Sequence, residues 1–319
     1  MDIVIIVSEK DIAGMNIRKK LILKNRFKSA ASNCNKQSAF IHSKTGAILY
    51  TIKEDSIHAA GLNKTIAKNA DLVIFATRHK GKDKRPVFSC HTQGNWSDAS
   101  DLMGGKSREL GICPANVLKK AFLLMQKLKQ DYENLKDFEI TLECTHHGPS
   151  LAIPSVFIEI GSAKEQWGND DASDFIADVI LNLAEYLDNL EQGDLTKKRP
   201  ENKENKNDNN NANKSEIWNN KTAAFGIGGP HYCGSFNKVM QKSSISVGHI
   251  CPKHMLHALD LEMIKQAIDK TIPKAEYVIL DWKGLGNEKQ RIISILEGAG
   301  IKYIKTKDAI IKYPIQAEA

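Results

Sequence analysis

Asp137-Phe138-Glu139-Ile140-Thr141-Leu142 runs directly into Glu143-Cys144-Thr145-His146-His147-Gly148-Pro149. The first six residues predict a β-strand, because apolar and β-branched side chains recur in a short run. The next seven place a carboxylate, a thiol and two imidazoles at the end of that strand, before a Gly-Pro stop. In open α/β sheets, ligands bind just beyond the carboxyl ends of strands. We therefore predict a site here, on an α/β fold.

Predicted strands and helices alternate through most of the chain. Strands are expected at 2–7, 39–52 (a hairpin), 71–77, 86–90, 137–142, 155–161, 222–227, 243–247, 276–281 and 303–304. Helices are expected at 13–21, 114–132, 172–187, 236–241, 256–268 and 288–296. This alternation predicts a three-layer α/β/α fold with a mixed, partly parallel sheet.

The composition suggests how the chain is divided. Residues 192–216 are rich in Asn and Lys and have almost nothing to bury, so we expect a disordered insert there. We expect residues 1–306 to form one catalytic α/β domain around that insert, with a small subdomain around 80–115 as an option. Residues 307–319 are expected to be a C-terminal tail.

The overall composition is that of an ordinary globular protein. The 319 residues are 41% hydrophobic and 26% charged, and no apolar run is long enough to cross a bilayer. The N-terminus lacks a basic region and resembles a strand rather than a signal peptide, so we expect a cytoplasmic protein. We also expect a monomer. Six scattered cysteines without a Cys-x-x-Cys pair indicate reduced thiols. The net charge of +7 permits an RNA partner without requiring one.

Five predicted strands end in chemically useful side chains. They end in His79, His91, the pair His146 and His147, His231, and Asp281. Each alone is explained by a solvated loop, since loops are normally polar. Parallel strands deliver their carboxyl ends to one edge of a sheet, so we expect these residues to lie together.

The paired histidines allow two arrangements. If the strand continued through them, His147 would share a face with Glu143, while His146 would point to the opposite face with Cys144. The two imidazoles could then not bind one metal ion. If the strand breaks before Gly148, they could. Each functional interpretation has a structural alternative. The histidines could simply be buried and hydrogen-bonded to backbone carbonyls. Cys144 could be a packed core residue rather than a nucleophile.

Two further segments are candidates for the site. Glu159 is a lone carboxylate in an apolar strand, so it needs a partner or a metal unless that strand is an exposed edge. Gly228 and Gly229 offer backbone N–H donors for an oxyanion or a ribose, or else form a tight turn. No metal motif such as His-Glu-x-x-His is present, so spacing alone does not indicate a metal.

Several motifs occur in the order typical of one family. They are the 143–149 stretch, Gly228-Gly229-Pro230-His231-Tyr232, Gly248-His249-Ile250 with Pro252-Lys253, and Asp281-Trp282-Lys283-Gly284. Arg78-His79-Lys80 and His91-Thr92-Gln93-Gly94-Asn95 also match. Together they resemble the archaeal and plant type of D-aminoacyl-tRNA deacylase, from about residue 2 to residue 305.

The resemblance implies a zinc-dependent hydrolase that cuts the ester between a D-amino acid and tRNA. It also implies a fold akin to nucleoside phosphorylases and peptidyl-tRNA hydrolases. Zn²⁺ lowers the pKa of its bound water to about 7, which provides a nucleophile at neutral pH. Beside this water we expect catalytic roles for His146, His147, Glu159, His231 and Asp281. We expect metal ligands among His91, His146, His147 and His231. We expect substrate binding, including the tRNA acceptor end, by His79, Asn95, Gly228, Gly229, His249, Lys253 and Lys283.

Two other functions are compatible with the sequence. One is a different hydrolase or phosphorylase on the same scaffold, acting on nucleosides or peptidyl-tRNA. The other is a non-catalytic tRNA-binding module, which would bind tRNA in a salt-sensitive way. Such a module has no need for so many histidines at strand ends.

Overall fold

The computed structural model describes residues 1–23, 27–29, 39–98, 103–197 and 222–315. Its largest element is an eight-stranded sheet with the strand order β2-β3-β4-β1-β5-β9-β6-β8. These strands are β1 Ile3–Ser8, β2 Phe27–Ser29, β3 Ala39–His42, β4 Ile48–Ile52, β5 Leu72–Arg78, β6 Val87–His91, β8 Glu139–Leu142 and β9 Ser155–Gly161. β1 pairs in parallel with β4 and β5, and β5 with β9, whereas β6 is antiparallel to β9. The sheet is therefore mixed.

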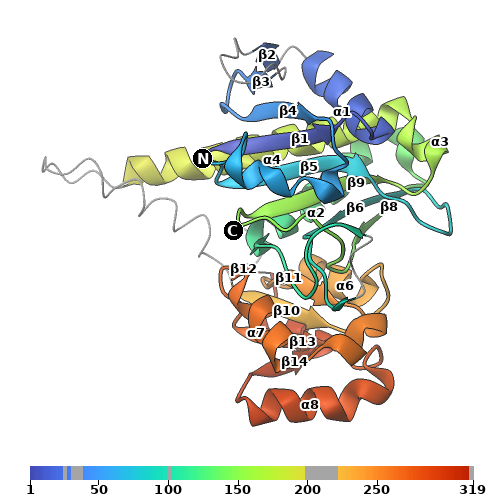
Figure 1. The fold of residues 1–319 in the computed structure, drawn as a ribbon, viewed down its shortest axis with the longest axis vertical. Helices are drawn as coiled ribbons and strands as arrows, with labels where there is room; N and C mark the ends of the chain where they lie inside the picture. Colours follow the sequence, from blue (N-terminus) through green and yellow to red (C-terminus); the bar gives the residue numbers. More distant parts are fainter. Residues whose placement is uncertain (24–26, 30–38, 99–102, 198–221, 316–319) are drawn as a thin grey trace, which may run out of the picture.

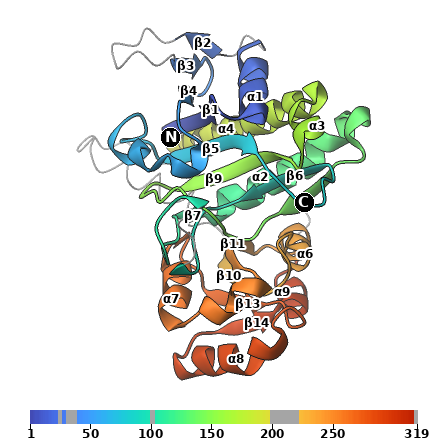
Figure 2. The same cartoon turned by 45° about the vertical axis from the view of Figure 1, so that its right-hand side comes forward.

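A second, parallel sheet follows in the sequence and forms the other half of the molecule (Figures 1 and 2). Its strand order is β11-β10-β13-β14, from β10 Ala223–Ile227, β11 Ser246–Cys251, β13 Tyr277–Leu280 and β14 Tyr303–Lys305. A short parallel pair, β7 Cys113–Pro114 with β12 Thr271–Ile272, makes a third sheet. Strands of both larger sheets therefore contribute segments to the region where the halves meet.

The apolar alternation of the strands explains why both faces of the large sheet are covered. On β1, Ile3, Ile5 and Val7 belong to one core cluster, and Val4 and Ile6 to another. The first cluster is shared with α1 Ile12–Leu23, α2 Ala115–Leu128 and α4 Asp170–Lys197. The second is shared with a segment of short 3₁₀ helices, η1 Ser56–His58 and η2 Ala60–Lys64. This layered α/β arrangement confirms the predicted fold class.

The remaining helices surround the smaller sheet or extend the core. They are α3 Lys164–Trp167, α6 Gly234–Lys242, α7 Leu261–Asp269, α8 Lys289–Gly298 and α9 Thr306–Lys312, with 3₁₀ turns η4 Lys129–Asp131, η5 Glu133–Leu135, η6 Lys253–Ala258 and η7 Gly286–Glu288. No helix in the described ranges combines the length and the apolar character that a membrane span requires.

Four local predictions need correction. Helix α4 runs to Lys197, so residues 192–197 of the expected insert are helical, while residues 198–216 lie outside the described ranges. Helix α9 occupies part of the expected tail, where Ala309 is fully buried and belongs to the main core cluster. Strand β11 begins at Ser246, three residues later than expected, so His249 lies within a strand rather than after one. Tyr132 lies beyond α2, which ends at Leu128. The division into domains stays a prediction.

The expectation of one shared edge for all five strand ends is wrong, for two reasons. β6 runs antiparallel to β9, so His91 at its carboxyl end lies opposite Phe157 in the interior of the sheet. β10 and β13, which precede His231 and Asp281, belong to the other sheet. The candidate residues can meet only where the two sheets adjoin.

Candidate functional site

A cavity of about 280 Å³ lies on the face of the large sheet that η1 covers. Phe157 and Glu159, two residues apart on β9, line it from the same face of the strand. The other lining residues come from η1 and its neighbours, the end of β5, the segments after β1 and β6, and the loops after β8 and β10: Asp11, Asp55, Ser56, Ile57, Thr77, Arg78, His79, Lys80, Met103, His146, His147 and His231.

The segment after β8 joins the two sheets through its backbone. The Cys144 amide donates to the His231 carbonyl oxygen at 3.0 Å, and the Thr145 amide donates to the Ile250 carbonyl oxygen at 2.9 Å. On the other side, the Glu143 amide donates to the Cys90 carbonyl oxygen at 3.1 Å. The segment is therefore held between β6 and the smaller sheet, which brings His231 to the histidines of the larger one.

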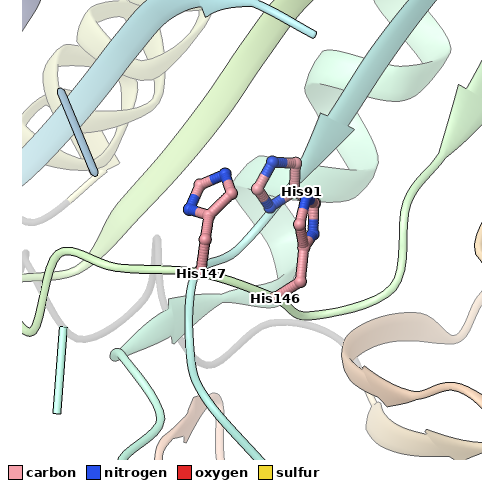
Figure 3. Close-up of side chains that lie close together, drawn as sticks. All are labelled: His91, His146 and His147. Atoms are coloured by element: carbon pink, nitrogen blue, oxygen red, sulfur yellow. The ribbon is translucent and has the colours of Figure 1, made fainter. Parts of the chain in front are cut away.

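The chain leaves the strand conformation before the paired histidines. β8 ends at Leu142, and His147 has a φ of 47°, in the left-handed region that L-residues rarely adopt. As a result, the rings of His146 and His147 lie on the same side, with centroids 4.3 Å apart. Figure 3 shows both rings beside that of His91, and a ring nitrogen of each lies within 4.8 Å of the others. Of the two predicted arrangements, the break is the one observed.

These three histidines share the same hydrogen-bond pattern. Nδ1 of His91, His146 and His147 lies 3.1, 2.8 and 2.5 Å from the carbonyl oxygens of Thr92, Cys144 and Gly148, respectively. A carbonyl can only accept, so each Nδ1 carries a proton, and in the neutral ring Nε2 keeps a lone pair. Metal-binding histidines are oriented in this way by a second hydrogen bond. His91 Nε2 is buried and has no hydrogen-bond partner among the described residues.

Two buried carboxylates, Glu143 and Glu159, lie beside this triad. Glu143 Oε2 is 2.7 Å from His231 Nε2, and its Oε1 is 3.1 Å from His79 Nδ1 in an ion pair without hydrogen-bond geometry. Glu159 accepts a hydrogen bond from Thr77 Oγ1 at 2.7 Å and lies 3.6 Å from His79 and 3.7 Å from His91. His79 thus faces both carboxylates.

The electrostatics follow from this pairing. Burial alone would lower the pKa of His79, but Glu143 and Glu159 outweigh burial and raise its pKa to about 10. Burial alone would raise the pKa of each carboxyl. For Glu143, His231 and His79 reverse that effect and hold the pKa well below its usual range. For Glu159, His79 and His91 do the same. The carboxylates are therefore ionised around a positively charged His79.

Two members of the triad, His146 and His147, favour the neutral form, whereas Glu159 and Glu143 outweigh burial and raise the pKa of His91. Burial, reinforced by the neighbouring histidines, holds the pKa of His146 well below its usual value. Burial and the proximity of His91 lower the pKa of His147 to about 4. Neutral imidazoles are the form that binds metals. The Cys144 thiol is fully buried, which raises its pKa, so it is protonated and unsuited to act as a nucleophile.

The structure brings six of the predicted site residues together. His79, His91, His146, His147, Glu159 and His231 lie within this cluster. Glu159 is on a central strand and 3% exposed, so the alternative of an exposed edge strand is wrong.

The other predicted site residues do not line the cavity. They are Asn95, Gly228, Gly229, His249, Lys253, Lys283 and Asp281. The Asn95 amide donates to the carbonyl oxygens of Gly104 and Lys106, and buried His249 lies against Thr145 Oγ1 and the Gly111 carbonyl oxygen. Asp281 accepts from the Gly284 amide at 3.2 Å.

Gly228 and Gly229 form the tight turn that was the alternative to an oxyanion site. Their φ values are 98° and 86°, and the Gly228 amide donates to the Cys251 carbonyl oxygen at 2.8 Å. Lys253 and Lys283 are exposed. The roles assigned to these residues stay predictions.

Sequence reasoning placed Glu143 at the site without assigning it a role, and it missed Thr77. Glu143 lies three residues before His146, in a stretch already singled out, and its lone position at a buried strand end could have identified it. Thr77 lies directly beside Glu159 in the β5–β9 register, a relationship that becomes visible only once the strands are paired.

Comparisons with known proteins show similarity to one family over most of the chain. Residues 66–304 match the model of the family described as D-aminoacyl-tRNA deacylase. The chain is 31% identical to the D-aminoacyl-tRNA deacylase of Thermococcus kodakarensis over 308 residues, covering 95% of this chain and 99% of that protein. The D-aminoacyl-tRNA deacylase of Methanosarcina acetivorans is 30% identical, with 98% and 94% covered.

Solved structures support the fold over the whole chain. A crystal structure described as a conserved protein of unknown function aligns with a TM-score of 0.78 and 26% identity, covering 99% of both chains. A Campylobacter jejuni nucleosidase aligns over 58% of this chain at 11% identity with a TM-score of only 0.34. The expected kinship with phosphorylases therefore stays a prediction.

Proposed function

The chain belongs to the D-aminoacyl-tRNA deacylase family, and from this premise we propose that it hydrolyses the ester between a D-amino acid and the terminal ribose of tRNA in the cavity over β9. The observation that carries this proposal is the cluster of five histidines and two ionised carboxylates around that cavity. Ester hydrolysis needs a group that takes a proton from water, and polar groups that stabilise charge on the carbonyl oxygen.

We propose that His91, His146 and His147 hold a Zn²⁺ ion. Three clustered imidazoles, two of them neutral, fit the ligand set of catalytic zinc sites, which keep a fourth position open, and binding would displace the proton that Glu159 favours on His91. The unpartnered Nε2 of His91 supports this fit, because a buried polar atom without a partner is costly. When bound, zinc polarises a carbonyl and lowers the pKa of water to about 7. The sequence also suggested His231 as a ligand. Its ring nitrogens instead cluster with Cys144 and His146, and with His79 and Glu143.

His231 is the proposed proton acceptor. Its side chain is 38% exposed and lines the cavity, so it can reach a substrate or a water molecule. Its Nε2 lies 2.7 Å from Glu143 Oε2, and its Nδ1, which lies 3.2 Å from Cys144 Sγ, is the nitrogen left to take a proton; the buried carboxylate stabilises the imidazolium so formed. Glu143 acts here through His231, as a positioning residue.

His79 has a separate role in this proposal. It is positively charged and lies between Glu143 and Glu159, so it neutralises two carboxylates that would otherwise repel each other in a buried site. Its Nε2 lies 2.9 Å from the Tyr232 hydroxyl, next to His231 in sequence. His79 therefore fixes the relative positions of the two sheets at the site, rather than contacting the amino acid.

The proposed partner is the acceptor end of tRNA, in the cytoplasm, and we expect a monomer. The test is deacylation of D- and L-aminoacyl-tRNA by the purified protein, with and without a chelator. We expect turnover of the D-form, little turnover of the L-form, loss of activity with chelator and recovery with added zinc. Equal rates on both enantiomers would contradict the chirality, and indifference to chelator would contradict the metal.

A further inference from the structure

A second cavity, of about 520 Å³, adjoins the candidate active site. Its lining carries five basic side chains and one carboxylate: Lys10, Arg78, Lys80, Lys84, Lys164 and Glu165. We call this cavity the basic groove. Arg78 and Lys80 also line the active-site cavity, so the two spaces share a wall at the end of β5.

The shared wall is built by three consecutive residues, Arg78, His79 and Lys80. His79 is buried and faces Glu143 and Glu159, whereas Arg78 and Lys80 line both cavities. Trp167 on the groove side donates from Nε1 to the His79 carbonyl oxygen at 2.9 Å. This hydrogen bond connects the wall of the groove to the backbone of His79, the residue that lies between the two buried carboxylates.

The lysines of the basic groove are available for a ligand. Arg78 forms an ion pair with Asp55 at 3.0 Å and donates to the Lys10 carbonyl oxygen at 2.6 Å, so its guanidinium is already occupied and mainly supports the wall of the groove. Lys10, Lys80, Lys84 and Lys164 are exposed, and none forms an ion pair within the part of the chain that the structure describes. Four exposed lysines around one hollow make a site of positive potential that favours phosphate groups.

We propose that the basic groove binds the phosphates of the single-stranded acceptor end of tRNA, directing the terminal ribose and its ester into the active-site cavity. This inference rests on the proposed function and adds the path of the RNA. It differs from the path expected from sequence, because Lys253 and Lys283 line neither cavity. Phosphate contacts position a substrate without reading its sequence, which suits an enzyme that acts on many tRNAs.

The test compares two substrates of one reaction, D-aminoacyl-tRNA and the D-aminoacyl ester of adenosine, which has the ribose but no phosphate. The variant is Lys10→Gln with Lys84→Gln and Lys164→Gln, three groove residues outside the active-site cavity. We expect the ratio of the KM for tRNA to the KM for the adenosine ester to rise about tenfold or more. The slope of log affinity for tRNA against log salt should fall by about 2, since each single-strand phosphate contact contributes roughly 0.7.

A matched control replaces three other exposed lysines, Lys127, Lys265 and Lys302, by Gln. They line neither cavity, and the KM ratio should stay at the wild-type value. A double variant, Lys253→Gln with Lys283→Gln, tests the other path. If that variant raises the ratio and the groove variant does not, the groove proposal is overturned.

The outcome separates this inference from the proposed function. If wild-type protein deacylates D-aminoacyl-tRNA but the groove variant has an unchanged ratio, only the groove proposal fails. If wild-type protein has no deacylase activity, the proposed function fails, and filter binding of uncharged tRNA then tests the groove. Equal, salt-sensitive binding by wild type and groove variant would overturn it, and weaker binding by the variant would support it.

Discussion

Glu143 and His231 follow strands of two different sheets, yet Glu143 Oε2 and His231 Nε2 lie 2.7 Å apart. Backbone bonds on either side make this approach possible, since the Cys144 amide donates to the His231 carbonyl oxygen and Glu143 forms a bridge with Tyr232. The site thus exists only when both sheets are folded and joined. Its chemistry depends on that contact.

Glu143→Gln should slow deacylation by about 10² to 10⁴, the range typical of general acid–base groups. The amide keeps the shape of the side chain but removes the charge that stabilises protonated His231. We expect kcat to fall with little change in KM, measured in single-turnover and steady-state assays. Glu139→Gln is the control, because this exposed carboxylate on the strand that precedes Glu143 pairs with Arg85 at 3.0 Å, away from the site. Equal defects in both variants would contradict the role of Glu143.

His146→Ala and His147→Ala should each abolish binding of the proposed zinc ion. The break after β8 places both rings in one donor group with His91, so either loss leaves two imidazoles. Zinc affinity should fall by at least about tenfold, because loss of a residue that only hydrogen-bonds to a metal ligand already lowers metal affinity by about tenfold to a hundredfold. The check is metal content by elemental analysis, with exposed His257→Ala as the control. Full zinc content in either variant would remove that histidine from the ligand set.

Much of the fold could be predicted from the sequence, because it depends on local patterns. The strands at 71–77 and 155–161 and the helix at 172–187 were recognisable from apolar runs and helical spacing, and β5, β9 and α4 lie there. The division into two sheets was not, since it depends on which strands pair. The antiparallel placement of β6 beside β9 could not be predicted either, because it also depends on which strands pair.

The candidate site was predictable to a similar extent. Histidines and Glu159 were identified by type and position, but partners such as Thr77 depend on strand register. Asp281 and His249 do not line the cavity, because a polar residue near a strand end can form hydrogen bonds with the backbone instead. His249 lies 3.1 Å from the Gly111 carbonyl oxygen and 3.2 Å from Thr145 Oγ1, inside β11.

His249 should make stability depend on pH. Burial lowers its pKa to about 3 from the ordinary value of 6.5. Between these values the unfolded chain binds the proton and the folded chain does not, so stability rises with pH. The contribution is fully present above about pH 6.5 and is lost as the pH falls towards 3. Urea unfolding should show a smaller difference between pH 5 and pH 7.5 for His249→Asn than for wild type, and equal differences would contradict this assignment.

Gly284→Ala should disturb the site from a distance, because two of the sequence motifs meet at this residue. A Cβ on Gly284 would lie 2.3 Å from the Gly229 backbone nitrogen, so the turn that carries His231 would have to move. Overpacking of this kind costs about 1–3 kcal/mol.

We expect lower thermal stability for Gly284→Ala and a fall in kcat as His231 shifts from Glu143. Gly298→Ala is the matched control, since nothing lies within 4 Å of its added Cβ. An active, fully stable Gly284→Ala would show that this close approach is not what requires glycine in the Asp281-Trp282-Lys283-Gly284 motif. A stable variant with reduced kcat would instead separate the positioning of His231 from the folding of the smaller sheet.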